Sequence, residues 1–127
     1  YAATATVAYP EDFTRKLRKA KGIRGAKFFH MLAPCPSGWK SEPAQSVHIS
    51  RLAVQTRVFP LYEIEKGEEY SINVWPAERV PVKEYLRLQG RFAHLKDADI
   101  AQIQENVDQA WTKLVAKARA NGQEIPE

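Results

Sequence analysis

The chain of 127 residues has a single cysteine, Cys35, and no glycine-rich phosphate-binding pattern. One cysteine cannot form a disulfide within the chain, so a disulfide-stabilised secreted domain is excluded and a reducing, cytoplasmic location is expected. No apolar stretch approaches the roughly 20 residues that a membrane-spanning helix needs. No signal-peptide pattern is present at the start. We therefore expect no membrane partner.

Residues that could form a catalytic or metal site on their own are also scarce. The three histidines, His30, His48 and His94, lie far apart in the sequence, and none has a carboxylate at ligand spacing. A zinc site within the chain would need two or more of them around Cys35, which the spacing disfavours. His30 lies in an apolar run, where a hydrogen-bonded core histidine is expected. No residue of this chain is predicted to be catalytic.

The net charge of +4 comes from one segment. Residues 15–27 hold seven basic side chains and no acidic one, whereas the rest of the chain holds 12 basic and 15 acidic residues. Such a basic helix could bind nucleic acid or attract an acidic protein by long-range steering. It lacks the interleaved aromatic residues on which single-stranded nucleic acids stack, and a solvated helix face is the simpler interpretation. We expect no nucleic-acid partner.

The first third of the chain predicts a βαβ unit. Residues 1–9 are β-like, Pro10-Glu11-Asp12 is typical of a helix start, and the apolar run in residues 27–33 predicts a buried strand. The expected apolar positions of the helix are Phe13, Leu17 and Ala20, with a stop at Gly22. A strand, a helix and a strand of these lengths imply parallel strands, and therefore an α/β protein of one domain's length.

The rest of the chain predicts a helix over residues 43–57, a β-hairpin around Lys66-Gly67 and a short helix from Pro81. The hairpin is expected outside the parallel sheet, as an arm. The most regular element is a long helix from Asp97 to Asn121-Gly122. Asp97 or Asp99 is expected to cap it, and residues 123–127 are expected to fray. Its predicted apolar stripe comprises Ile100, Ile103, Val107, Ala110/Trp111, Leu114 and Ala118.

Cys35 lies between two prolines in the stretch Ala33-Pro34-Cys35-Pro36-Ser37-Gly38-Trp39. Proline fixes its own φ and restricts the residue before it, so this loop is stiff. A stiff loop suits a thiolate that must point in one direction, as a metal or cluster ligand must. A lone cysteine is, however, more often a small buried hydrophobic residue. The residues alone leave both interpretations open.

The chain begins at Tyr1 with neither an initiator methionine nor a lead-in to its first β-like segment. We therefore expect it to be a piece of a longer polypeptide.

The order of motifs resembles one family, the β subunits of 2-oxoacid:ferredoxin oxidoreductases (the pyruvate synthase group), in their C-terminal part. The resemblance begins with residues 1–13 and continues through the basic helix to His30-Met31-Leu32-Ala33-Pro34-Cys35-Pro36-Ser37-Gly38-Trp39. It also includes residues 51–54, 59–63 and 81–95, and weakens only after about Lys96. The most specific stretches are the cysteine loop and Leu88-Gln89-Gly90-Arg91-Phe92-Ala93-His94-Leu95.

The resemblance implies a fold, cofactors and partners. Residues 1–60 would be the C-terminal part of a thiamine diphosphate-binding α/β domain, and residues 61–127 a hairpin arm with a helical tail. Such enzymes decarboxylate a 2-oxoacid, transfer the acyl group to coenzyme A and pass electrons through [4Fe–4S] clusters to ferredoxin. Cys35 would be the fourth cysteine ligand of one cluster. The other three ligands, and the residues that hold Mg²⁺ and thiamine diphosphate, would lie outside this chain.

Other features take an interpretation from the same resemblance. Pro34 and Pro36 would stiffen the ligand loop, and Trp39 would either shield the cluster from water or simply pack in the core. The hairpin and residues 89–92 would be subunit-contact surface. The basic segment would steer an acidic ferredoxin or be a plain solvated face.

Two hypotheses of different classes follow. The first is an enzyme part, inactive by itself, that supplies one cluster ligand to an oxidoreductase acting on pyruvate or a related 2-oxoacid. The second is a non-catalytic basic α/β module that binds a protein or nucleic-acid partner through the helix of residues 10–22 and the hairpin.

Overall fold

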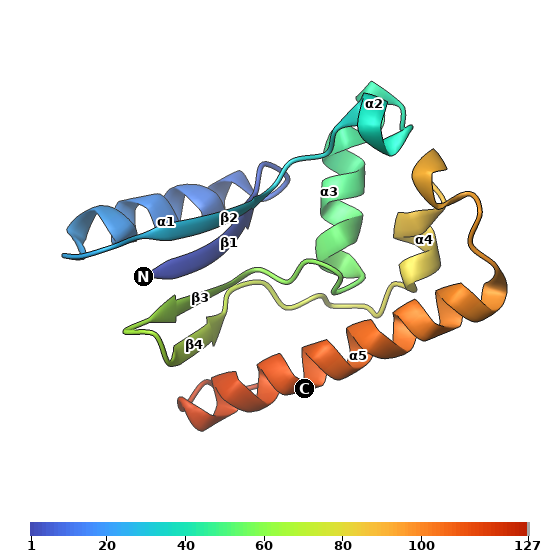
Figure 1. Cartoon of the computed structure of the whole chain (residues 1–127). Coiled ribbons are helices and arrows are strands. Elements are labelled where there is room, and N and C mark those ends of the chain that lie inside the picture. Colours follow the sequence, from blue (N-terminus) through green and yellow to red (C-terminus); the bar gives the residue numbers. More distant parts are fainter. Residues whose placement is uncertain (127) are drawn as a thin grey trace.

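Small residues at the start of the chain build the centre of the sheet. The computed structural model describes residues 1–126. Strand β1 (Ala2–Thr6) pairs in parallel with β2 (Phe28–Leu32) and antiparallel with β3 (Tyr62–Glu65), which continues into β4 (Glu69–Ile72). The strand order is β2-β1-β3-β4. The protein is therefore α/β as predicted, with a mixed sheet (Figure 1).

Helix α1 (Pro10–Gly22) connects β1 to β2 and confirms the βαβ unit. The prediction of its buried face was wrong at Leu17, which is 45% exposed, whereas Lys16 is fully buried and Ala20 nearly so. Positions 16 and 17 both fall at helical spacing from Phe13 and Ala20, so periodicity cannot distinguish them. The hydrogen bonds of Lys16 to Thr4 on β1 and to Asp12 on α1, described below, explain why the lysine is the inner residue.

Strand β2 was predicted to be buried, and this was wrong. It lies at one edge of the sheet, and Phe28 is 66% exposed and Met31 38% exposed. His30 is exposed as well, not a core histidine, and its ring packs edge-on against Phe59 at 5.1 Å between centroids. An apolar run is compatible with a central strand or with an edge strand, because its composition does not show which segments lie beside it.

The second layer of structure is a group of short helices beside the sheet (Figure 1). They are α2 (Pro36–Trp39), the 3₁₀ turn η1 (Pro43–Gln45), α3 (Ser46–Gln55), α4 (Val82–Leu86) and the 3₁₀ turn η2 (Gly90–Phe92). The core between α3 and α4 consists of Ile49, Leu52, Ala53, Val82, Tyr85 and Leu86. Trp39 and Phe92 pack against this core from the cysteine loop and from η2.

The β3–β4 hairpin turns at Lys66 and Gly67, both with positive φ (53° and 84°). Glycine adopts this conformation without a steric penalty, which is why the pair predicted a hairpin. The hairpin differs from the prediction in one respect: β3 pairs with β1 through Ala2–Ile64 and Ala3–Glu63. It extends the sheet and does not lie outside it.

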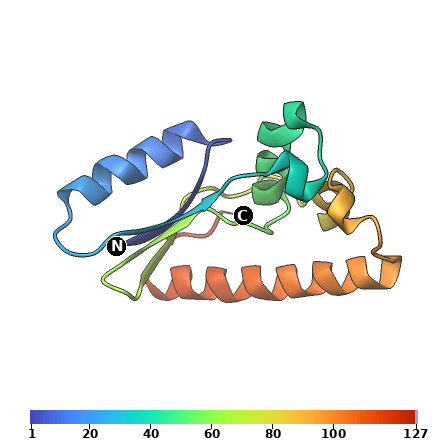
Figure 2. The same cartoon turned by 45° about the horizontal axis from the view of Figure 1, so that its top comes forward.

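Helix α5 (Asp97–Ala120) runs along the molecule and packs on β4 (Figure 2). Asp99 accepts a hydrogen bond from the backbone N–H of Lys96 at 2.8 Å, so the predicted aspartate does stabilise the helix start. Trp111, Leu114 and Ala118 are buried with Ile72, which confirms the predicted stripe there, whereas Ala110 is exposed. The same stripe continues, half-buried, towards the α3–α4 core through Ile100, Ile103 and Val107.

The residues after α5 are fixed to the hairpin. Gln123 accepts a hydrogen bond from the Ile72 N–H at 2.8 Å and donates one to the Ile72 carbonyl at 2.7 Å. Asn121 accepts another from the Tyr70 N–H at 2.7 Å. The prediction that fraying begins at Gln123 was therefore wrong at that residue, and for Glu127 it lies outside the described residues.

Among residues 1–126, no helix is both long enough and apolar enough to cross a lipid bilayer.

Candidate functional site

Cys35 sits where the chain leaves β2 and enters α2. Its backbone is extended (φ −112°, ψ 98°), and Pro36 opens α2 directly after it. Proline suits this position because it has no N–H to satisfy and its φ already fits a helix. The thiol is free and exposed, so the interpretation of Cys35 as a small buried hydrophobic residue is excluded in this chain.

Backbone hydrogen bonds hold the loop in one shape. The Trp39 N–H donates to the Cys35 carbonyl at 2.8 Å, and the Ser41 N–H donates to the Pro36 carbonyl at 3.0 Å. Between them, Lys40 takes a left-handed conformation (φ 51°), which reverses the chain. The chain from Cys35 to Ser41 is therefore held in one shape.

The Ser37 hydroxyl lies 3.8 Å from the Cys35 sulfur. Donation from the Gly38 backbone N–H, the Ser37 hydroxyl and the Ser37 N–H lowers the pKa of the Cys35 thiol. A side chain at Gly38 would place its Cβ 3.4 Å from the sulfur, so glycine gives the sulfur close access to the backbone. This environment favours a thiolate, which is the form that binds metals.

The described part of the chain does not complete a metal site around this thiolate. Within residues 1–126, no group of three or more His, Cys, Asp or Glu side chains is arranged to hold a metal ion. An iron–sulfur cluster of the four-iron type takes four cysteine ligands. The donor set here fits one ligand of such a cluster and no more.

Residues 89–92, interpreted from the sequence as subunit-contact surface, contact the cysteine loop within the chain. The guanidinium carbon of Arg91 lies 3.9 Å from the centroid of the Trp39 ring. The Gly90 N–H donates to the Lys40 carbonyl at 2.9 Å. Sequence reasoning missed this pairing because about 50 residues separate the two segments, and no local pattern links them.

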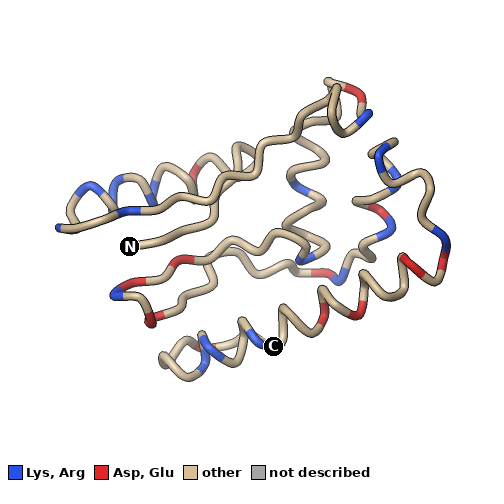
Figure 3. Tube along the Cα trace, in the orientation of Figure 1, with Lys and Arg blue, Asp and Glu red and all other residues tan. Residues whose placement is uncertain are grey.

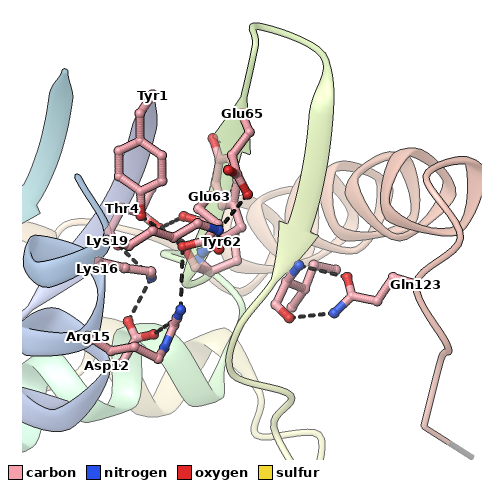
Figure 4. A network of polar contacts seen from close by, with 12 residues as sticks. Tyr1, Thr4, Asp12, Arg15, Lys16, Lys19, Tyr62, Glu63, Glu65 and Gln123 are labelled. Carbon is pink, nitrogen blue, oxygen red and sulfur yellow. Dashed lines mark hydrogen bonds and ion pairs between the residues drawn. The ribbon is translucent and has the colours of Figure 1, made fainter. Parts of the chain in front are cut away.

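A second polar cluster lies between α1 and the sheet (Figure 4). Lys16 is fully buried, and its Nζ donates to the Thr4 carbonyl at 2.8 Å and to the Asp12 carboxylate at 2.7 Å. Lys19 contacts Glu63 at 2.6 Å and also pairs with Glu65. Charged side chains at these depths are stable only when paired.

Ionisation in this cluster is shifted accordingly. Burial lowers the pKa of Lys16 despite its bond to Asp12. Burial alone would raise the pKa of Glu63, but hydrogen bonds from Lys19 and Tyr1 bring it below its usual range. Burial, and then the bond to Glu63, raise the pKa of the Tyr1 hydroxyl. Glu63 and Lys19 support one another as ions, while Tyr1 remains a neutral hydrogen-bond donor, which indicates a structural role.

The basic segment is therefore less free than its composition indicates. Lys16 and Lys19 face the sheet, and Arg15 bonds Asp12 at 2.8 Å. Figure 3 shows the remaining positive charge along α1 and the turn after it. The exposed basic residues there are Arg18, Lys21, Arg24 and Lys27.

Comparison with known proteins places these features in a family. No family model matches the chain. It is 52% identical over 109 residues to the pyruvate synthase subunit PorB of Methanocaldococcus jannaschii, covering 86% of this chain and 36% of that protein. It is 48% identical over 124 residues to the ketoisovalerate oxidoreductase subunit VorB of Pyrococcus furiosus, covering 96% of this chain and 40% of that protein. The chain belongs to the PorB/VorB family of oxidoreductase subunits.

Membership of the PorB/VorB family confirms the resemblance found in the motifs and favours the enzyme-part hypothesis over the binding module. The PorB subunit of Methanothermobacter marburgensis is a further relative, 46% identical over 114 residues, covering 90% of this chain and 39% of that protein. The chain thus spans about two fifths of the length of these curated relatives. The matched part contains the only thiol of the chain, Cys35.

Proposed function

We propose that the chain is part of the β subunit of an enzyme that oxidatively decarboxylates a 2-oxoacid. The acyl group passes to coenzyme A, CO₂ is released, and two electrons leave through [4Fe–4S] clusters to ferredoxin. The names of the relatives support a 2-oxoacid substrate: two act as pyruvate synthase subunits and one belongs to a ketoisovalerate oxidoreductase. Pyruvate is our first candidate, and the reaction is placed in the cytoplasm.

Within that enzyme, Cys35 supplies one thiolate ligand to a [4Fe–4S] cluster. The observation that carries this role is an exposed thiol at the start of a hydrogen-bonded turn, with the Ser37 hydroxyl 3.8 Å from the sulfur. Hydrogen bonds to cluster sulfurs adjust the reduction potential, so the N–H groups of Ser37 and Gly38 are placed to adjust it here. Trp39, half-buried beside the loop, limits the access of water.

The remaining cofactors and ligands come from outside this chain. Thiamine diphosphate, with Mg²⁺, supplies the carbanion chemistry when bound, and the other three cluster cysteines complete the site. We assign residues 1–60 to the cofactor-binding α/β domain and residues 61–127 to a hairpin and helical tail that contacts other subunits. The exposed basic residues of α1 are the part of this chain suited to attract an acidic ferredoxin.

The assembled enzyme with Cys35→Ala tests the ligand role. Because one ligand of four is removed, we expect loss of the electron paramagnetic resonance (EPR) signal of one cluster and of about four iron atoms per subunit. Glu42→Ala, a substitution at an exposed position near the same loop, is the matched control and should keep both. An unchanged signal in Cys35→Ala would refute the assignment.

A further inference from the structure

The short α2 helix is held at its far end by η2. Helix α2 has only four residues, and its last residue, Trp39, bonds back to the Cys35 carbonyl. A shift of Trp39 or Lys40 would therefore be passed directly to the backbone of Cys35. Two contacts from η2 prevent such a shift.

The first contact is a close backbone approach at Gly90. Its N–H donates to the Lys40 carbonyl at 2.9 Å. A Cβ built on Gly90 would lie 2.8 Å from the Lys40 Cβ and 3.0 Å from the Lys40 carbonyl oxygen. One of these atoms is a backbone oxygen and the other is a Cβ, the first side-chain carbon. Neither can move aside unless the backbone of the loop moves. Only glycine allows the two segments to approach this closely.

The second contact is the stacking of Arg91 on Trp39. The guanidinium lies 3.9 Å from the Trp39 ring centroid and 4.5 Å from that of Phe92. Its Nε and Nη2 both donate to the side-chain oxygen of Gln89, at 3.0 and 2.7 Å. A planar group with several fixed donors can make this combination, and a lysine cannot.

The anchor of the stack lies in the core. Gln89 is 1% exposed, and its amide nitrogen donates to the Tyr85 carbonyl at 2.8 Å. Tyr85 is itself a member of the α3–α4 core. A continuous set of contacts therefore runs from the core through Gln89 and Arg91 to Trp39, and from Trp39 to Cys35.

We propose that Gly90 and Arg91 are positioning residues that fix the direction of the Cys35 thiolate towards its cluster. The inference rests on the proposed function, since it concerns the orientation of the same ligand. A ligand cysteine held by a fixed loop keeps its N–H donors at constant distance from the sulfur, and those donors influence the potential and electronic structure of a cluster. A loosened loop would change both while the ligand remains bound.

The test uses the assembled, anaerobically purified enzyme. Arg91→Lys keeps the charge and loses the fork and the planar stack, whereas Gly90→Ala separates η2 from Lys40. In both variants we expect the iron content to be kept, the midpoint potential of the cluster to shift and its EPR line shape to change. Two variants are the matched controls and should match the parent. Arg87→Lys changes an exposed arginine at the end of α4, and Gly22→Ala adds a Cβ where nothing lies within 4 Å.

A second measurement, the alkylation rate of Cys35, needs no bound cluster. In the metal-free protein, Arg91→Lys and Gly90→Ala should alter the rate of alkylation of Cys35 severalfold, because a mobile loop changes the access to the sulfur. If Cys35→Ala abolishes the signal while both positioning variants match the parent in potential, line shape and alkylation rate, the positioning proposal is wrong and the ligand assignment stands. If Cys35→Ala keeps the signal, the ligand assignment within the proposed function is wrong, and the positioning proposal that rests on it fails with it.

Discussion

Two regions of the molecule each hold one polar group in place, by opposite means. They are the interface of α1 with the sheet, which holds Lys16, and the loop after β2, which holds Cys35. Lys16 is fully buried, and side-chain and backbone oxygens satisfy its ammonium group. Cys35 is exposed, and its loop is held by backbone hydrogen bonds and by the stack of Arg91 on Trp39. At Lys16 the polar group itself makes the hydrogen bonds. At Cys35 the surrounding loop makes them, and the thiol is left exposed.

This difference separates a structural role from a functional one. The charges beneath α1 are paired with one another, so they contribute to the stability of the fold and leave nothing to bind a ligand. Hydrogen bonding to the Cys35 sulfur favours the thiolate, and the thiol is free and exposed. The most basic segment of the sequence thus serves mainly the fold at its inner positions, and the only cysteine is the residue that we propose serves a site.

The largest effect on stability is expected at Lys16. We expect Lys16→Ala to reduce the free energy of unfolding by about 3 kcal/mol, because the Thr4 carbonyl and the Asp12 carboxylate lose a buried partner. Lys16→Met should lose less, because it retains the methylene packing and Arg15 still bonds Asp12. Urea unfolding measures both, with Arg18→Ala as the exposed control on the same helix. An equal effect of Lys16→Ala and Arg18→Ala would contradict a structural role for this cluster.

A smaller effect, dependent on pH, is expected at Glu63. Its pKa is lowered in the folded protein, so its contribution is present above the unfolded value of about 4.3 and is lost as the pH falls through the folded pKa. Glu63→Gln should therefore reduce stability by about 2 kcal/mol at pH 7. The difference from the parent should shrink as the pH falls below the unfolded value. Thermal unfolding at pH 7 and pH 3 measures it, and a difference that is equal at both values would argue against the prediction.

The smallest effect concerns the cysteine loop. The Ser37 hydroxyl is one of the groups that lower the pKa of the Cys35 thiol. Ser37→Ala should therefore slow the alkylation of the metal-free protein at pH 7 roughly twofold. Ser46→Ala removes a hydroxyl that bonds Pro43 instead, and it should leave the rate unchanged. A rate in Ser37→Ala equal to that of the parent would show that the backbone donors alone set the reactivity.

The sequence predicted those elements whose own residues determine them. The stripe of α5, the proline that opens α1 and the Lys66-Gly67 turn are local patterns, and the structure confirms each. The stiffness of the Cys35 loop was also predictable, because two prolines limit the backbone wherever they stand.

The errors arose where a residue's environment depends on distant segments. Leu17 and Lys16 fit the same helical period, and only the position of the Thr4 carbonyl and Asp12 makes the lysine the inner residue. His30 was expected in the core because its neighbours are apolar, but β2 is an edge strand. The contact of Arg91 with Trp39 depends on tertiary folding, so neither local motif could indicate it.

The bonds made by Asn121 and Gln123 have a consequence for how the sheet can grow. At the outer side of β4, the side-chain amides of these two residues take up the N–H groups of Tyr70 and Ile72 and the carbonyl of Ile72. That edge therefore lacks the free backbone N–H groups with which a further strand would pair, which protects the hairpin from edge-to-edge aggregation. In residues 1–126, β2 has a strand on one side only. Any strand that lengthens this sheet must therefore join it beside β2, the strand that leads into Cys35.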